Sequence, residues 1–313
     1  MLHLLHEKML KRCVFDQIKG LVCVVLLFAL SSRANGEDYA GRYKQLQDQH
    51  ADAQMEPLLN EWREKAPNDP EAWIASANYY FNQRQVMLST KPPGKGDFKL
   101  TDKKTGKQAG SISFEQDKGN IKRAADLLQE ATTKFPDRLD IWCGLAFIYQ
   151  ESGDFENELS ILKKMVAYAR EHPTELKWLR GEPLNEQADK FVAAKLHSYG
   201  AYYEEKETPE DDKRFLQIAM FGTEQFSNLP YAFNDVAQFY YVSGDKTQAR
   251  EWLKKANKVD PKDTLVLMNL GKVSLKLGDS AGAQKYYHEV VKVDPNGEYA
   301  QEAKEALKKL KKK

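Results

Sequence analysis

The last part of the chain repeats itself, and this repeat constrains the fold more than any other feature of the 313 residues. Residues 230–263 and 264–297 align at an offset of 34 residues. Matched positions carry apolar or small residues, in the pairs Phe233/Leu267, Val236/Leu270, Ala237/Gly271, Tyr240/Ser274, Gly244/Gly278, Ala249/Ala283, Leu253/Tyr287, Ala256/Val290 and Pro261/Pro295. Apolar residues three and four apart predict two helices in each copy, separated by SGD or LGD and ended by VDP.

This pattern resembles the tetratricopeptide repeat, a helix-turn-helix unit of about 34 residues. Another copy is especially complete, because Trp142, Leu145, Ala146 and Tyr149 reproduce the pattern of the family's first helix, and Gly153 follows at the turn. The resemblance implies an all-α fold, a right-handed α-solenoid. We expect about six units over residues 37–296 and a capping helix over 297–313.

The first 36 residues are typical of an export signal. Basic residues precede an apolar run over 21–30, and Ala34 and Gly36 are the small residues that a signal peptidase requires. The run is too short for a bilayer crossing, which needs about twenty residues. We therefore expect cleavage after Gly36 and a protein that is periplasmic or secreted. The alternative is that residues 1–36 form an interfacial or buried N-terminal helix.

Charge and motifs exclude several classes of function. The net charge is +1, and residues 1–36 carry +3, which leaves −2 for the rest of the chain. A mildly acidic body argues against nucleic-acid binding through the phosphate backbone. No H-E-x-x-H, G-x-S-x-G, P-loop or dinucleotide motif is present, and only Cys143 follows the leader. We therefore expect no enzyme, no cofactor and no metal site.

A lysine-rich segment interrupts the second unit over residues 86–119. The runs FKLTD and GSISF flank a Thr-Gly turn and alternate in character, which is typical of a β-hairpin. Between residues 91 and 107, two aspartates accompany six lysines, which are Lys91, Lys95, Lys99, Lys103, Lys104 and Lys107. The insertion is either a binding element at an edge of the solenoid or a loop that covers the end of a helix.

In the family, the first helices of the units line a concave groove. The matching positions here are Glu71, Asn78, Phe81 and Asn82 in the second unit, Gln150 and Glu151 in the third, His197 in the fourth, Tyr231, Asn234, Gln238 and Tyr241 in the fifth, and Lys272 in the sixth. Amides suit the backbone of an extended peptide, and aromatic rings suit its side chains. Alternatively, some of these aromatic residues pack against neighbouring units.

Two functions follow from these features. The resemblance implies an exported, non-catalytic scaffold that binds a protein or peptide partner in its groove. The alternative is an envelope-associated protein whose basic insertion binds an anionic polymer or lipid head groups, with the solenoid as its support.

Overall fold

The computed structural model describes residues 33–34, 37–94, 96–206 and 208–311. These residues are mostly helical, which confirms the predicted fold class. They form two compact units: the first runs up to Tyr168 and includes Glu175–Pro183, and the second contains Ala169–Thr174 and the residues from Leu184 onward. Residues 1–32, which hold most of the expected export signal, lie outside the described ranges. Within those ranges, no helix has both the length and the apolar character that a bilayer crossing requires.

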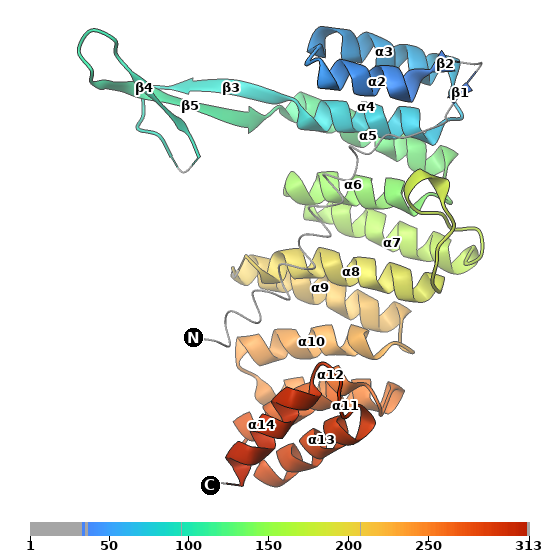
Figure 1. Ribbon diagram of the computed structural model, residues 1–313, viewed down its shortest axis with the longest axis vertical. Helices are drawn as coiled ribbons and strands as arrows, with labels where there is room; N and C mark the ends of the chain where they lie inside the picture. Colours follow the sequence, from blue (N-terminus) through green and yellow to red (C-terminus); the bar gives the residue numbers. More distant parts are fainter. Residues whose placement is uncertain (1–32, 35–36, 95, 207, 312–313) are drawn as a thin grey trace. The chain divides into compact units, whose positions relative to one another are not determined.

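The first unit is built mainly from helix pairs (Figure 1). Two short strands, β1 (Arg33–Ala34) and β2 (Glu37–Asp38), pair ahead of them. The helices are α2 (Tyr39–Asp48) and α3 (Asp52–Lys65), α4 (Pro70–Asn82) and α5 (Lys118–Lys134), and α6 (Leu139–Glu151) and α7 (Phe155–Glu171). We call the earlier member of each pair its first helix.

A proline and a tryptophan six residues apart fix the start of two first helices. The indole Nε1 of Trp73 donates to the carbonyl of Pro67 at 3.1 Å, and that of Trp142 donates to the carbonyl of Pro136 at 2.9 Å. Both rings are buried. Because a buried indole N–H needs an acceptor, the equal spacing between proline and tryptophan in these two repeats has a structural cause.

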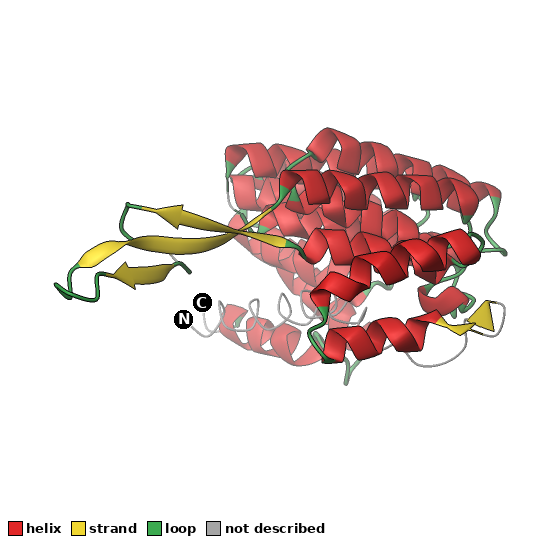
Figure 2. Ribbon diagram, turned by 90° about the horizontal axis from the view of Figure 1, so that it is seen from above, coloured by secondary structure: helices red, strands yellow, loops and turns green. Residues whose placement is uncertain are grey.

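Between α4 and α5 the chain forms a three-stranded antiparallel sheet, which we call the arm (residues 84–116). Its strands β3 (Arg84–Ser89), β4 (Phe98–Thr101) and β5 (Gln108–Gln116) lie in the order β3-β5-β4. The predicted hairpin is present as β4 and β5, with Gly106 in the left-handed region at φ 67°. The third strand, β3, extends this prediction. In both views the arm projects away from α4 and α5 (Figures 1 and 2).

The second unit contains the two copies with which the sequence repeat was defined. Its helices are α8 (Ala188–Glu204) and α9 (Pro209–Gln225), α10 (Pro230–Ser243) and α11 (Lys246–Val259), α12 (Thr264–Lys276) and α13 (Ser280–Val293), and α14 (Ala300–Leu310). Gly244 and Gly278 take φ 99° and 79° at the predicted turns. These positive angles explain the glycine at each of these positions.

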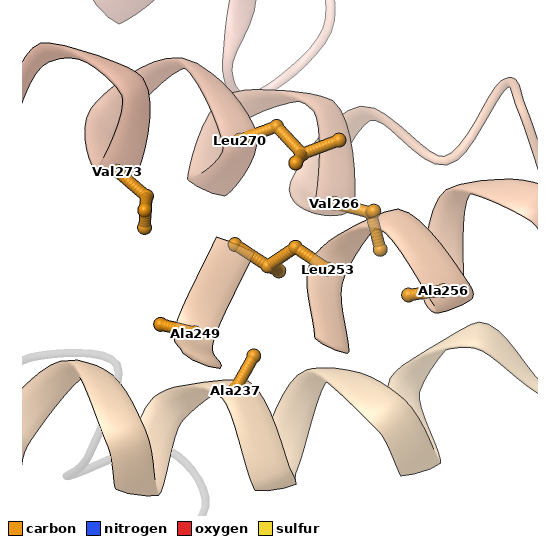
Figure 3. Packing of buried hydrophobic residues seen from close by; sticks show 7 residues of the cluster. All are labelled: Ala237, Ala249, Leu253, Ala256, Val266, Leu270 and Val273. Atoms are coloured by element: carbon orange, nitrogen blue, oxygen red, sulfur yellow. The ribbon is translucent and has the colours of Figure 1, made fainter. Parts of the chain in front are cut away.

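Small residues in the second unit allow its helices to approach closely. Figure 3 shows one buried cluster, formed by Ala237, Ala249, Leu253, Ala256, Val266, Leu270 and Val273. At the equivalent of Ala237 in the next repeat, a Cβ on Gly271 would lie 2.4 Å from Cε1 of Tyr287. Tyr287 is itself the equivalent of Leu253. The larger ring in the last repeat therefore requires the smaller residue opposite it.

Candidate functional site

Side chains from three consecutive first helices of the second unit bond to one another. They include most of the residues that the sequence placed in a groove on α8, α10 and α12, together with two neighbours. We call this set the first-helix face, and it consists of His197, Glu204, Tyr231, Asn234, Gln238, Asn269 and Lys272. Each of these residues is partly exposed.

Direct hydrogen bonds join the first-helix face from one repeat to the next. Nε2 of Gln238 on α10 donates to Oε1 of Glu204 on α8 at 3.1 Å, between residues one repeat period apart. The hydroxyl of Tyr231 donates to the carbonyl of Lys190 at 3.0 Å. Nδ2 of Asn269 on α12 donates to Oδ1 of Asn234 at 2.8 Å. These bonds fix the positions of the side chains across the face.

An ion pair lies within the same face. Nδ1 of His197 is 2.9 Å from Oδ1 of Asp235, which is 8% exposed. The negative charge of Asp235 raises the pKa of His197 to about 9, although burial acts in the opposite direction. The imidazole is therefore protonated at neutral pH. Burial is also the main cause of a raised pKa at Tyr231.

A small pocket opens beside His197 and Tyr231. Apolar side chains of α8, α9 and α10 form most of its wall, including Leu196, Phe215 and Ile218. It has room for about one water molecule. This pocket is therefore too small for a cofactor.

The two remaining predicted residues of the second unit have different partners. Nζ of Lys272 lies 3.1 Å from Oε1 of Glu302 on α14, and both side chains are about one-third exposed. Tyr241 is partly exposed at the end of α10, where the ammonium of Lys246 lies 4.2 Å from the centre of its ring. Lys272 thus connects the face to the last helix.

In the first unit, the structure corrects the prediction for Phe81 and Gln150. Phe81 is 7% exposed and meets the ring of Phe147 edge-on, with the centroids 5.6 Å apart. Gln150 is 3% exposed, and its Nε2 donates to Oε1 of Glu158 at 2.7 Å. Glu158 is fully buried and requires such a donor. Phe81 and Gln150 therefore pack inside the unit and do not line a groove.

Glu71 belongs to a largely buried cluster of charges. Nη2 of Arg138 lies 2.8 Å from Oε1 of Glu71, and the same guanidinium bonds both oxygens of Asp140 at 2.9 and 2.7 Å. The Arg138 side chain is 5% exposed. Burial raises the pKa of Glu71, and the charge of Arg138 opposes this effect. Glu71 therefore joins α4 to the start of α6.

The other predicted residues of the first unit lie near the ends of α4 and α6. Nδ2 of Asn82 donates to the backbone carbonyl of Asn78 at 2.8 Å, within one turn of α4. Nδ2 of Asn78 is buried and has no hydrogen-bond partner within the described part of the chain. Glu151 is exposed at the last position of α6.

The described lysines of the arm are exposed at its turns and on β4, and they are Lys91, Lys99, Lys103, Lys104 and Lys107. Lys95 lies outside the described residues. Among the residues that the structure describes, none of these five ammonium groups forms an ion pair. The carboxylate of Asp97 accepts from the backbone of Gly94, and that of Asp102 accepts from the backbone of Lys104 and Thr105. Backbone hydrogen bonding from Thr105 is the main cause of the lowered pKa of Asp102.

The arm also carries an exposed apolar surface, which was not predicted from the sequence. Val86, Leu88, Phe98 and Phe114 are 58%, 72%, 62% and 56% exposed. The signal that could have revealed it is the alternation of Ser111, Ile112, Ser113 and Phe114, which predicts a strand with one apolar face.

The comparisons with known proteins identify the type of repeat. Residues 231–263 and 265–296 match the tetratricopeptide repeat, and these ranges cover α10 with α11 and α12 with α13. No curated protein matches the chain. Within the described ranges, no group of three or more His, Cys, Asp or Glu side chains could hold a metal ion.

Several solved repeat structures are similar to this chain at low identity. MamA is 14% identical with a TM-score of 0.36, over 57% of this chain and 91% of its own. YrrB, described as having an unusual peptide-binding site, is 12% identical with a TM-score of 0.38, over 79% and 97%. The first such domain of Spaghetti (RPAP3), bound to an HSP90 peptide, is 19% identical with a TM-score of 0.34, over 38% and 90%.

Proposed function

We propose that this tetratricopeptide-repeat chain is a non-catalytic scaffold that binds an extended peptide segment of a partner protein on the first-helix face. The supporting observation is that hydrogen bonds between repeats hold polar side chains of α8, α10 and α12 in place. A ligand that binds there does not have to order these side chains, so less conformational entropy is lost.

The side chains of the face suit the backbone of a peptide. Each amide has two N–H donors and a carbonyl acceptor, and the bond between Asn269 and Asn234 uses one donor and one acceptor. The remaining groups of Asn234, Asn269 and Gln238 can bond the alternating N–H and C=O groups of an extended chain. Tyr241 and Val242, which is 61% exposed, can contact its side chains.

Two of the three charged residues of the face are paired with an opposite charge, which favours a segment without strong net charge. His197 is paired with Asp235, and Lys272 is paired with Glu302. Because these charges compensate one another within the unit, we propose that the backbone and apolar side chains of the peptide contribute most of the affinity, rather than a terminal carboxylate.

A selection of random linear peptides displayed on phage against the full chain tests this proposal. Peptides that bind the face should lose affinity about tenfold or more when Asn234→Ala and Gln238→Ala are combined, since each change removes hydrogen bonds. Lys254→Ala on α11, which removes an exposed pair with Glu251, is the matched control and should leave binding unchanged. Equal affinity for all three proteins would contradict the proposal.

We propose in addition that the chain is exported. The support is the composition of residues 1–36, in which basic residues, an apolar run and small residues follow in the order of a cleaved signal. Sequencing the N-terminus of the protein recovered from the cell envelope should give a chain that begins at Glu37. Recovery of the uncleaved chain from the cytoplasm would contradict this.

A further inference from the structure

One face of the arm is apolar and continuous. Directly paired residues of antiparallel strands lie on the same face of a sheet. The register pairs Val86 with Phe114, Leu88 and Phe98 with Ile112, and Leu100 with Gly110. The apolar face of the arm therefore consists of Val86, Leu88, Phe98, Leu100, Ile112 and Phe114. Phe98 and Phe114 contact each other edge-on across β5 and β4, with their centroids 5.9 Å apart.

The opposite face of the arm is mainly polar. The residues that alternate with the apolar set are Gln85, Met87, Ser89, Lys99, Ser111, Ser113 and Glu115. The sheet is thus amphipathic. Soluble sheets of this kind normally bury the apolar face against another element, and a large exposed apolar patch marks a contact surface.

The charge of the arm narrows the choice of partner. Residues 84–116 hold seven basic and three acidic residues, a net +4, while residues 37–83 and 117–313 together carry −6. The lysines at the β4–β5 turn, which are Lys103, Lys104 and Lys107, border the apolar face at the end of the arm. Both aspartates of the loops bond backbone N–H groups, so they stabilise the turns.

Different partners satisfy these features to different degrees. A second copy would bring two arms of net charge +4 against each other, which is unfavourable. A nucleic acid or another purely ionic polymer would neutralise the lysines but would leave the apolar side chains in water. An anionic bilayer surface satisfies both, because its interface takes up apolar side chains and its head groups attract lysines.

We infer that the arm docks on the surface of a bilayer that contains anionic phospholipids. The apolar face inserts into the interface, the lysines of the turns contact the head groups, and the polar face stays in water. This inference concerns the first unit and does not depend on peptide binding by the second unit.

Two fluorescent probes on opposite faces of the arm test the inference. Leu88→Cys on the apolar face and Ser113→Cys on the polar face are each labelled with nitrobenzoxadiazole in the full chain, with Cys13→Ser and Cys23→Ser as background. Cys143 is 1% exposed and does not compete for the dye. Because both proteins share the same leader, only contact by the arm distinguishes the two probes.

With vesicles of phosphatidylglycerol and phosphatidylcholine, the probe at residue 88 should brighten and shift to shorter wavelength, and the probe at residue 113 should not. Vesicles of phosphatidylcholine alone should give little change. Combining Lys103→Gln, Lys104→Gln and Lys107→Gln should raise the lipid concentration needed for half-maximal signal on the order of a hundredfold. The matched control, Lys308→Gln, Lys309→Gln and Lys311→Gln, should keep the original lipid dependence.

Three results would overturn the inference. The first is no response of the probe at residue 88 to anionic vesicles, or the same response from both probes. The second is a response that depends on protein concentration without lipid, which would assign the apolar face to a second copy. The third is loss of the signal in the control at the C-terminus with retention in the variant of the arm. Circular dichroism confirms that each variant is folded.

Discussion

The first-helix face and the arm differ in how their side chains interact with neighbouring residues. On the first-helix face, residues that were predicted to line a groove form hydrogen bonds with the neighbouring repeat, as Gln238 does with Glu204. On the arm, the described lysines form no ion pair and Leu88 is 72% exposed. Repeats need many polar and small residues to hold each other in register, whereas the arm leaves its apolar side chains and lysines exposed. The following substitutions test this comparison.

The largest effect on stability is expected for a substitution of Arg138, in the helical part of the first unit. Arg138→Met leaves the carboxylates of Glu71 and Asp140 without their cation in a largely buried site. We expect the free energy of unfolding to fall by about 3–5 kcal/mol, measured by urea denaturation. Lys177→Met removes a more exposed pair with Asp137 and should cost less than about 1 kcal/mol. Similar losses of unfolding free energy for both variants would show that the buried cluster stabilises the protein no more than the exposed pair does.

A glycine in the second unit provides the next largest effect. Gly271→Ala places a methyl group against the ring of Tyr287 and should lower the free energy of unfolding by about 1–3 kcal/mol. Gly222→Ala on α9 has nothing within 4 Å of its new Cβ. This variant should instead stabilise the unit by about 0.5–1 kcal/mol, because alanine favours the helix. If both variants are stabilised, α12 and α13 do not pack as described.

The pair between His197 and Asp235 predicts a dependence of stability on pH. The pKa of His197 in the folded chain is about 9, above its ordinary value of 6.5, so folding favours the protonated ring. The stabilisation is complete below pH 6.5 and is lost as the pH rises through 9. We expect a loss of about 1 kcal/mol, less than the pKa difference alone implies, because the ring is 43% exposed and water screens the pair.

His197→Gln serves as the reference for this measurement. It removes the titrating group, so the difference between the two proteins in urea denaturation between pH 6 and pH 10 isolates the pair. If the unfolding free energies of both proteins follow the same pH profile, then His197 does not contribute.

The smallest effect on stability is expected on the arm. Leu88→Ser and Phe98→Ser remove exposed apolar side chains, so each should change the free energy of unfolding by less than about 0.5 kcal/mol. A loss of 2 kcal/mol or more would mean that another part of the protein covers the apolar face. The comparison between the arm and the helices would then fail.

The sequence predicted the features that depend on local chemistry. The 34-residue period and the turn glycines predicted α10 to α13. Gly244 and Gly278 supply the positive φ angles that the turns need. The hairpin of β4 and β5 was likewise predictable from the Thr-Gly turn. The strand β3 was not predicted, because it follows α4 after one residue and pairs with a strand that comes much later in the chain.

The candidate site was less predictable because its residues depend on distant partners. Gln150 is buried and bonds Glu158 on the facing helix. Glu71 bonds Arg138, which lies 67 residues later in the chain. The repeat register indicates which face a residue occupies, but it does not indicate which side chains on that face bond to one another. The apolar face of the arm became evident only with the register of all three strands.

Hydrogen–deuterium exchange of the full chain, with and without phosphatidylglycerol vesicles, tests the contrast between the two regions most directly. We expect new protection in residues 84–116, while exchange in α8, α10 and α12 stays unchanged. Protection of those helices without protection of the arm would contradict the account, because it would assign contact with the bilayer to the repeats.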